Sequence, residues 1–220
     1  MSPKKDNGAL KPWEILFDRM IGILETLPAP LREREEWIFG GGTALGLYYD
    51  HRESHDIDIF IKNPALIPYL SPRVNDRTER MSHSYTEMSN FLKLHFSEGE
   101  IDFIVSPSVT GSPSRKTEIR GNIFQIESPE EIISKKILYR SDEFKPRDVF
   151  DTVVALRHDS GILLKNRNVL GSRFPVLLKR LSVLEKAYSG NNAGIRAMND
   201  YADLIPGMYS SLTAAINSLL

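Results

Sequence analysis

Residues 40–60 read GGGTALGLYYDHRESHDIDIF, and this stretch decides the fold. The residues just before it, Glu36-Trp37-Ile38-Phe39, favour a short β-strand. After the glycines, residues 43–49 are rich in Ala and Leu and predict a helix. Residues 56–61 alternate at their start and predict a second strand. The order is therefore strand, glycine turn, helix, strand.

The glycine turn has the pattern of a phosphate site. At the start of a helix, backbone N–H groups point outward and the helix dipole favours an anion. Gly41 and Gly42 would let a phosphate approach the main chain closely, and Thr43 adds a hydroxyl near the cap. Glycines before a helix more often serve only the turn, so the pattern alone is weak.

Two aspartates at the start of the second strand strengthen the prediction. Asp56 and Asp58 are two residues apart, so both carboxylates project from one face, while Ile57 and Ile59 project from the other. Two adjacent negative charges repel unless a cation lies between them, and oxygen ligands suit Mg²⁺ or Mn²⁺. The alternative is a solvent-exposed acidic strand face.

A third aspartate lies in another predicted strand. Residues 91–96 and 101–105 predict a β-hairpin around the turn at 97–100, and Asp102 interrupts an otherwise apolar run. Burying a lone Asp without a partner is costly. If this strand lies beside residues 56–61, three carboxylates could hold two metal ions. The alternative is that Asp102 faces solvent just after the turn.

The flanking sequence predicts mainly helices. The spacing of apolar residues predicts an amphipathic helix over 12–27, and Ser128 with Glu131 forms a capping box that starts a helix running to Arg140. The remaining expected elements are helices near 64–70, 84–90, 146–158, 176–188, 195–204 and in the last dozen residues, a strand at 123–126, and a loop at 106–118.

This order of elements predicts an α+β fold. We expect a small mixed β-sheet flanked by helices, followed by a helical C-terminal region. The predicted division is a core with its N-terminal helix over residues 1–127 and a helical region over residues 128–220 that contributes Lys136 and Asp148 to the site.

Charged side chains on the later helices have two interpretations. Lys136 and Arg140 are four residues apart and share a helix face, where two cations would suit a triphosphate; a solvated helix face is the alternative. Asp148 lies near a helix start, where it would also complement the dipole. His51 and His55 have a zinc-pair spacing, but they fall in a loop, so we expect His51 to brace that loop.

The composition excludes some classes of protein. The chain has 220 residues and no cysteine, which excludes disulfides and thiolate metal sites. The net charge of −1 argues against binding to nucleic acid mainly through a basic surface. The sequence has no apolar run long enough for a membrane span and no secretory signal, so we expect a cytoplasmic protein.

The motifs together resemble the nucleotidyltransferase family of AbiEii/AbiGii-type toxins, in the DNA polymerase β-like superfamily. The family pattern is GGTAL, a variable stretch, then HR-x-S-x-D-[IL]-D-[LF]-F, and residues 41–60 match every fixed position. A looser resemblance extends to Asp102, Lys136 and the Arg147-Asp148-x-x-Asp151 motif, covering about residues 36–158. In residues 159–220 we identify no further motif of the family.

The resemblance implies a role for each matched position. Asp56 and Asp58 would be metal ligands, and Asp102 a third ligand or the catalytic base. The other implied site residues would bind the phosphates, orient the acidic loop or complete the site: Gly41, Gly42, Thr43, Arg52, Ser54, Lys136, Arg140 and Asp148.

The predicted function is Mg²⁺-dependent (or Mn²⁺-dependent) transfer of a nucleotide from an NTP to a tRNA 3′ end or a protein hydroxyl. The resemblance also implies a toxin of a toxin–antitoxin or phage-defence system, with an antitoxin protein as partner. The alternatives are a non-catalytic NTP-binding or partner-binding module on the same fold, and a metal-dependent phosphohydrolase.

Overall fold

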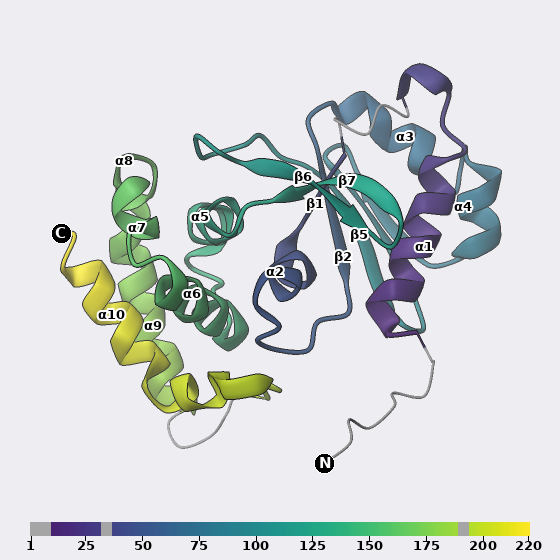
Figure 1. Cartoon of the computed structure of the whole chain (residues 1–220). Helices are drawn as coiled ribbons and strands as arrows, with labels where there is room; N and C mark the ends of the chain where they lie inside the picture. Colours follow the sequence, from purple (N-terminus) through teal and green to yellow (C-terminus); the bar gives the residue numbers. More distant parts are fainter. Residues whose placement is uncertain (1–9, 32–36, 189–193) are drawn as a thin grey trace, which may run out of the picture. The chain divides into compact units, whose positions relative to one another are not determined.

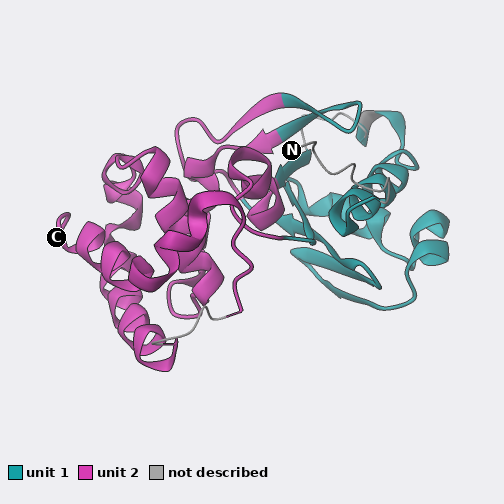
Figure 2. Cartoon of the chain, turned by 60° about the horizontal axis from the view of Figure 1, so that its bottom comes forward, with its two compact units in different colours: residues 1–39, 54–106, 117–125 teal, residues 40–53, 107–116, 126–220 magenta. Residues whose placement is uncertain are grey.

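The computed structural model describes residues 10–31, 37–188 and 194–220. Residue 36 of the expected first strand lies outside these ranges. The chain forms two compact units, each built from several chain segments (Figure 2). Unit 1 comprises residues 1–39, 54–106 and 117–125, and unit 2 comprises residues 40–53, 107–116 and 126–220. The division into regions 1–127 and 128–220 stays a prediction.

The strands form one mixed sheet of seven in the order β3-β4-β5-β2-β1-β7-β6 (Figure 1). Their bounds are β1 (Trp37–Gly40), β2 (Ile57–Ile61), β3 (Tyr85–Met88), β4 (Phe91–Phe96), β5 (Gly99–Val105), β6 (Ser114–Ile119) and β7 (Asn122–Glu127). β2 and β5 are parallel, whereas β4 is antiparallel to both β3 and β5. The α+β class and the mixed sheet are confirmed.

Along the chain, helices precede the first strand, separate several strands and follow the last one. The α-helices are α1 (Pro12–Leu24), α2 (Gly41–Tyr49), α3 (Ile67–Leu70), α4 (Asp76–Met81), α5 (Pro129–Arg140), α6 (Pro146–His158), α7 (Ile162–Lys165), α8 (Arg167–Leu170), α9 (Phe174–Tyr188) and α10 (Met208–Asn217). The 3₁₀ segments are η1 (Ala29–Leu31), η3 (Pro64–Leu66), η4 (Gly171–Arg173) and η5 (Asn199–Gly207).

Alternation along β2 places its isoleucines in the core of unit 1. Ile57, Ile59 and Ile61 are buried, and each such side chain stabilises the fold by roughly 1.5–3 kcal/mol. α1 packs against β2 and β5 through a face that includes Leu16 and Met20, both fully buried. The intervening residues of β2 therefore face away from this core.

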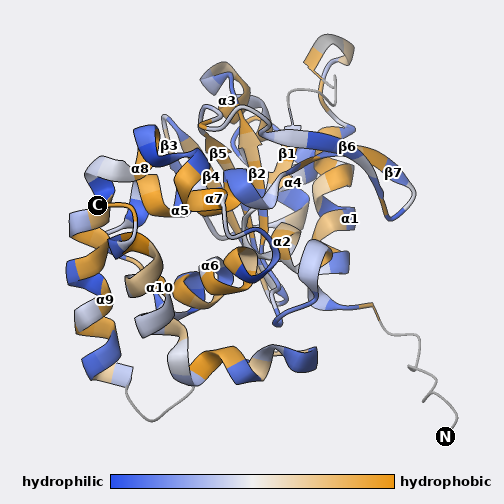
Figure 3. Ribbon diagram, turned by 60° about the vertical axis from the view of Figure 1, so that its left-hand side comes forward, coloured by the Kyte–Doolittle hydropathy of each residue, from blue (hydrophilic) through white to orange (hydrophobic). Residues whose placement is uncertain are grey.

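Unit 2 is a helical bundle. α2 packs on α5 and α6, and α10 packs on α6 and α9. In α9 the buried residues are Phe174, Leu177, Leu181 and Leu184, at steps of three and four, which is the apolar stripe of an amphipathic helix. The resulting alternation of hydrophilic and hydrophobic residues along α9 is visible in Figure 3. The expected helical C-terminal region is confirmed.

The strongest local signals gave the correct elements. The expected β4–β5 hairpin is present, but its turn is shorter than the expected 97–100: it comprises only Ser97 and Glu98, with Phe96 paired to Gly99. Ser128 caps α5, because its hydroxyl accepts the Glu131 N–H at 3.1 Å. The other half of the predicted capping box is wrong, because the Glu131 carboxylate accepts from the main chain of Val109 and Thr110 while the Ser128 N–H donates to Pro113. α6 has the predicted bounds, with its proline in the first turn.

Two predictions between β2 and β4 were wrong. The expected helix near 84–90 is strand β3, because pairing with β4 outweighs the local helical preference. Helix α4 was missed, although Asn75 caps it by accepting the N–H groups of Arg77 and Thr78 at 3.0 and 3.1 Å. An Asn followed by acidic residues is a helix-start signal that short helices share with turns.

Two further predictions need correction. The expected loop at 106–118 contains most of β6, an outermost strand whose charged residues Arg115 and Lys116 are exposed, as is typical of sheet edges. The expected helix at 195–204 is not an α-helix. Ala197 forms an antiparallel bridge with Arg52, and the 3₁₀ segment η5 begins only at Asn199.

Candidate active site

Two of the predicted site aspartates are neighbours in unit 1. Asp58 of β2 and Asp102 of β5 are Cα partners in a parallel pair of strands. Residues in register on adjacent strands point to the same face, so the two carboxylates share the face opposite Ile57 and Ile59. A shared carboxylate site required the strand of Asp102 to lie beside residues 56–61, and β5 does lie beside β2.

Asp56 immediately precedes β2 and is half-buried. Its Oδ1 accepts the main-chain N–H of Glu100 at 3.0 Å, so the start of β5 holds this carboxylate. Its negative charge is also one of the causes that raise the pKa of Asp102. Asp56, Asp58 and Asp102 therefore belong to one acidic region of unit 1.

Asp102 has an unusual environment for a carboxylate. Its Oδ2 accepts from Lys93 Nζ at 2.9 Å, whereas its buried Oδ1 has no hydrogen-bond partner among the described residues. Burial raises the pKa of Asp102, and the charges of Glu100 and Asp56 add to this rise, although Lys93 opposes it. An orphaned carboxylate oxygen is costly and marks a position that could receive a cation or a proton.

Lys93 is a site residue that the sequence reasoning missed. It is the cross-strand partner of Asp102 in the β4–β5 hairpin, and its Nζ also contacts Glu100, which in turn lies 3.0 Å from His95 Nδ1. The two-residue turn at Ser97 and Glu98 fixes the register of the hairpin and places Lys93 opposite Asp102. The expected turn at 97–100 would instead have placed His95 opposite Asp102, which is why Lys93 was missed.

The donor chemistry of the acidic region fits Mg²⁺ or Mn²⁺. Carboxylate oxygens are the ligands these hard cations prefer, and Asp102 Oδ1 lacks a partner within the described part of the chain. However, no group of three His, Cys, Asp or Glu side chains among the described residues is arranged to hold a metal ion. Metal ligation by Asp56, Asp58 and Asp102 therefore stays a prediction.

The raised pKa of Asp102 predicts a stability effect that is independent of catalysis. Its folded-state pKa lies above the unfolded value of about 3.9, so the ionised carboxylate destabilises the fold at neutral pH. We expect Asp102→Asn to raise the free energy of unfolding at pH 7, measured by urea denaturation in EDTA. The gain should vanish as pH falls below about 4, where the carboxylate is protonated in both states. An equal loss of stability at both pH values would contradict this.

The glycine turn has the backbone that the sequence predicted. β1 ends at Gly40, α2 begins at Gly41, and Gly41 has a φ of 70°, which glycine adopts without strain. Gly41 and Gly42 are half-buried and Thr43 is buried in the first turn of α2. The strand–turn–helix arrangement is therefore present, while phosphate binding by these residues stays a prediction.

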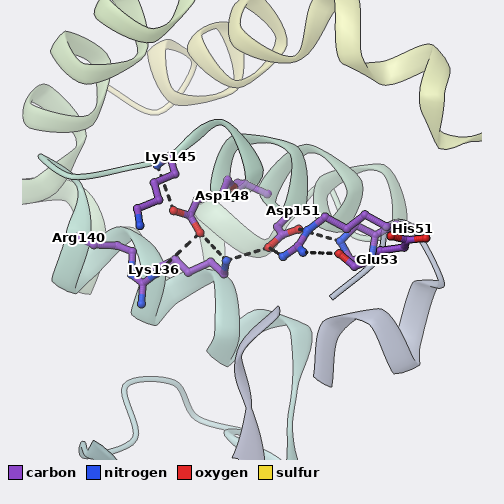
Figure 4. Close-up of polar contacts among 9 residues, drawn as sticks. His51, Glu53, Lys136, Arg140, Lys145, Asp148 and Asp151 are labelled. Carbon is purple, nitrogen blue, oxygen red and sulfur yellow. Dashed lines mark hydrogen bonds and ion pairs between the residues drawn. The ribbon is translucent and has the colours of Figure 1, made fainter. Parts of the chain in front are cut away.

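Unit 2 contains a buried network of ion pairs centred on Asp151, whose side chain is fully buried (Figure 4). Arg52 binds this carboxylate through two nitrogens, with Nε to Oδ1 at 2.6 Å and Nη2 to Oδ2 at 2.8 Å. Lys136 Nζ reaches both Asp148 Oδ1 at 2.6 Å and Asp151 Oδ2 at 2.8 Å. The charges of these two carboxylates and two cations therefore neutralise each other in a site that is largely shielded from water.

His51 completes this network, as the sequence predicted for a residue that braces the loop. Its Nε2 lies 2.8 Å from Asp151 Oδ1, and its ring stacks on Phe150 at 5.8 Å. The ionised carboxylate can only accept a hydrogen bond, so we assign the proton to Nε2. Met198 donates its N–H to the His51 carbonyl at 2.8 Å, which joins the loop to the C-terminal segment.

The pKa values of the two network aspartates are lowered. Burial would raise the pKa of Asp151, but the charges of Lys136 and Arg52 and their hydrogen bonds outweigh it and hold the pKa well below its usual range. The same balance, with Lys136 as the main opposing charge, lowers the pKa of Asp148. Both carboxylates are therefore ionised at neutral pH.

The other predicted site residues lie at the margin of the buried network or outside it. Arg140, one turn after Lys136 on α5, lies 3.9 Å from Asp148 Oδ1 and is 45% exposed. Ser54, in the chain segment that follows α2 and precedes β2, is half-buried. Lys136 and Arg52 lie with Asp148 in unit 2, whereas the acidic region belongs to unit 1. The roles assigned to these residues stay predictions.

The fold is similar to those of two solved structures. The structure of a "putative nucleotidyltransferase from H. pylori" matches 96% of this chain and 99% of its own, with a TM-score of 0.52 and 19% sequence identity. JHP933 from Helicobacter pylori matches 94% of this chain and 92% of its own, with a TM-score of 0.50 and 17% identity. At these identities the likeness is one of fold. Comparison with curated proteins gives no match.

The family follows from the sequence match. The model of the nucleotidyl transferase AbiEii toxin family, a type IV toxin–antitoxin system, matches residues 24–174. This is more than half of the chain, and the chain belongs to that family. The resemblance identified from residues 41–60 is therefore confirmed. None of the described helices is long and apolar enough to cross a membrane.

Proposed function

We propose that this protein transfers a nucleotide from an NTP to a hydroxyl group of an acceptor, with Mg²⁺ (or Mn²⁺) at Asp56, Asp58 and Asp102. The main support is the in-register pair of Asp58 and Asp102, with Asp56 two residues away on the chain. The acceptor is a tRNA 3′ end or a protein hydroxyl. When bound, the metal supplies positive charge to the triphosphate and lowers the pKa of the attacking hydroxyl.

The chemical step is a displacement at the α-phosphorus of the NTP. The acceptor oxygen forms a bond to this phosphorus, and the bond to the oxygen bridging to the β-phosphate breaks, so pyrophosphate leaves. Asp102 takes the proton of the attacking hydroxyl. Its Oδ1, which has no hydrogen-bond partner among the described residues, and its raised pKa suit the role of a general base.

The remaining predicted residues bind the triphosphate or support the site. The turn at Gly41, Gly42 and Thr43 offers main-chain N–H groups and a hydroxyl to the phosphates. In this proposal Arg140, whose side chain is 45% exposed, neutralises negative charge on the triphosphate. Lys136, one helical turn away on α5, is already neutralised by Asp148 and Asp151, so its role is to hold this face of the helix in place. Arg52 and Ser54 orient the loop that precedes Asp56.

The proposed biological role is that of a toxin. The family is one of nucleotidyltransferase toxins in toxin–antitoxin systems. We propose that transfer to its acceptor stops growth of the cell in which it acts, in the cytoplasm, and that an antitoxin protein counteracts it. Co-expression with the product of the neighbouring gene would test this pairing.

The test of the proposed reaction is label transfer. The purified protein is incubated with Mg²⁺ and each α-³²P-labelled NTP, together with either total tRNA or a protein extract treated with ribonuclease. The expected result is label on one acceptor class, with stoichiometric release of pyrophosphate and no transfer in EDTA.

Other outcomes of this assay support the competing functions. Binding of NTP without turnover in every arm would favour a non-catalytic module on the same fold. Release of nucleoside monophosphate without labelled acceptor would favour a phosphohydrolase. Either outcome would overturn the proposed reaction.

A further inference from the structure

The turn between β4 and β5 lies directly against Asp56. Glu100 donates its N–H to Asp56 Oδ1 at 3.0 Å. A Cβ atom built on Gly99 would lie only 2.9 Å from the same Oδ1. Contacts this short essentially never occur at real Cβ atoms, so a side chain at residue 99 would displace the carboxylate. The same Cβ would also lie 3.2 Å from Leu16 Cδ1, a tight but longer contact.

The position of this turn is fixed from two sides. Gly99 pairs with Phe96 in the hairpin ladder. Arg19 of α1 binds the carboxylate of Glu98 through both terminal nitrogens, at 3.0 and 2.7 Å. Because the turn is held, a clash at residue 99 is relieved most readily by rotation of the Asp56 side chain.

Gly99 is also required by its own backbone. Its φ is 146°, a conformation that residues with a side chain rarely adopt. In this conformation the N–H of the next residue reaches Asp56. The backbone conformation of Gly99 directs the Glu100 N–H to Asp56, and the missing side chain of Gly99 leaves space for the same carboxylate.

We propose that Gly99 and the main-chain N–H of Glu100 are positioning groups for Asp56. The N–H fixes one carboxylate oxygen, and the bare Cα of Gly99 leaves room for it. Metal-ligating carboxylates are commonly oriented by hydrogen bonds of this kind. This inference rests on the proposed function, in which Asp56 is a metal ligand.

The test compares Gly99→Ala with Gly121→Ala. Gly121 also has a positive φ, 74°, but a Cβ there would meet nothing within 4 Å, so this control carries backbone strain without displacing a carboxylate. Mn²⁺ alone is the probe, titrated and followed by electron paramagnetic resonance. We expect Gly99→Ala to weaken Mn²⁺ binding at least about tenfold, and Gly121→Ala to leave it unchanged.

A second measurement is independent of metal. In EDTA, hydrogen exchange of the Glu100 amide should be about tenfold faster in Gly99→Ala than in the wild type, because the hydrogen bond to Asp56 is lost. Circular dichroism melting establishes that each variant is folded. If Gly99→Ala does not fold, Asp56→Asn and Asp56→Ala replace it, since only the Asn side chain retains an acceptor for this N–H.

The outcomes separate this inference from the proposed function. Mn²⁺ affinity and Glu100 exchange equal to wild type in folded Gly99→Ala would overturn the inference. Equal Glu100 exchange in Asp56→Asn and Asp56→Ala would also overturn it. Absence of an Asp58-dependent Mn²⁺ site in the wild type would instead count against the proposed function, and the amide exchange would still decide whether the turn positions Asp56.

Discussion

Replacing Asp58 by Asn should lower the rate of nucleotidyl transfer at least about 10³-fold and abolish growth inhibition, while the protein stays folded. Asp58 is in register with Asp102 and half-buried on the face opposite the isoleucines. Asn keeps the shape of the side chain but removes its charge, so a divalent cation loses a ligand that the amide replaces poorly. The measurement is a single-turnover transfer rate with saturating Mg²⁺.

The matched control for this prediction is Asp76→Asn. Asp76 is an exposed aspartate in the first turn of α4, in the same unit as Asp58. Its substitution should change neither the transfer rate nor toxicity. A transfer rate for Asp58→Asn within tenfold of the wild type would mean that the acidic region is not the catalytic centre.

Much of the fold was predictable because its strongest signals are local. The N-cap at Ser128, the proline in the first turn of α6 and the alternation in β2 each act over a few residues. β3 and β6 were not predictable in this way. Their residues are polar or mixed, and they are strands because a neighbouring strand pairs with them.

The candidate site was likewise predictable only in part. The spacing of Asp56 and Asp58 and the apolar run around Asp102 indicated acidic residues on neighbouring strands, and the register of β2 and β5 is as that interpretation required. The partners of the charged groups could not be inferred from spacing. Asp151 binds Arg52 across 99 residues of sequence, and such pairs depend on tertiary packing.

The second large effect is expected for stability, from the buried network of unit 2. Asp151→Asn should lower the free energy of unfolding by about 3–5 kcal/mol, because it leaves Arg52 and Lys136 buried with one carboxylate between them. The measurement is urea denaturation at pH 7, followed by circular dichroism. The control is Asp159→Asn, an aspartate whose side chain is 43% exposed and paired with Lys165, for which the expected loss is at most about 1 kcal/mol.

The pH dependence of this effect has a definite sign. The folded-state pKa of Asp151 lies well below the unfolded value of about 3.9, so its stabilising contribution is full above that value and declines as pH falls through it. The difference between wild type and Asp151→Asn should therefore be constant from pH 7 to about pH 5 and shrink below about pH 4. A difference that stays constant to pH 3 would contradict the assigned ionisation.

The loss of unfolding free energy expected for Asp151→Asn arises from leaving buried positive charge without its partner. It is not the net contribution of the ion pairs to stability. Taking charged groups out of water costs about as much as their attraction returns, so a complete apolar replacement of a buried pair is often neutral. Arg52→Met with Asp151→Leu should therefore lose clearly less than the sum of the two single variants. Additive losses would mean that Arg52 and Asp151 stabilise unit 2 independently, through packing, and that the ion pair between them is incidental.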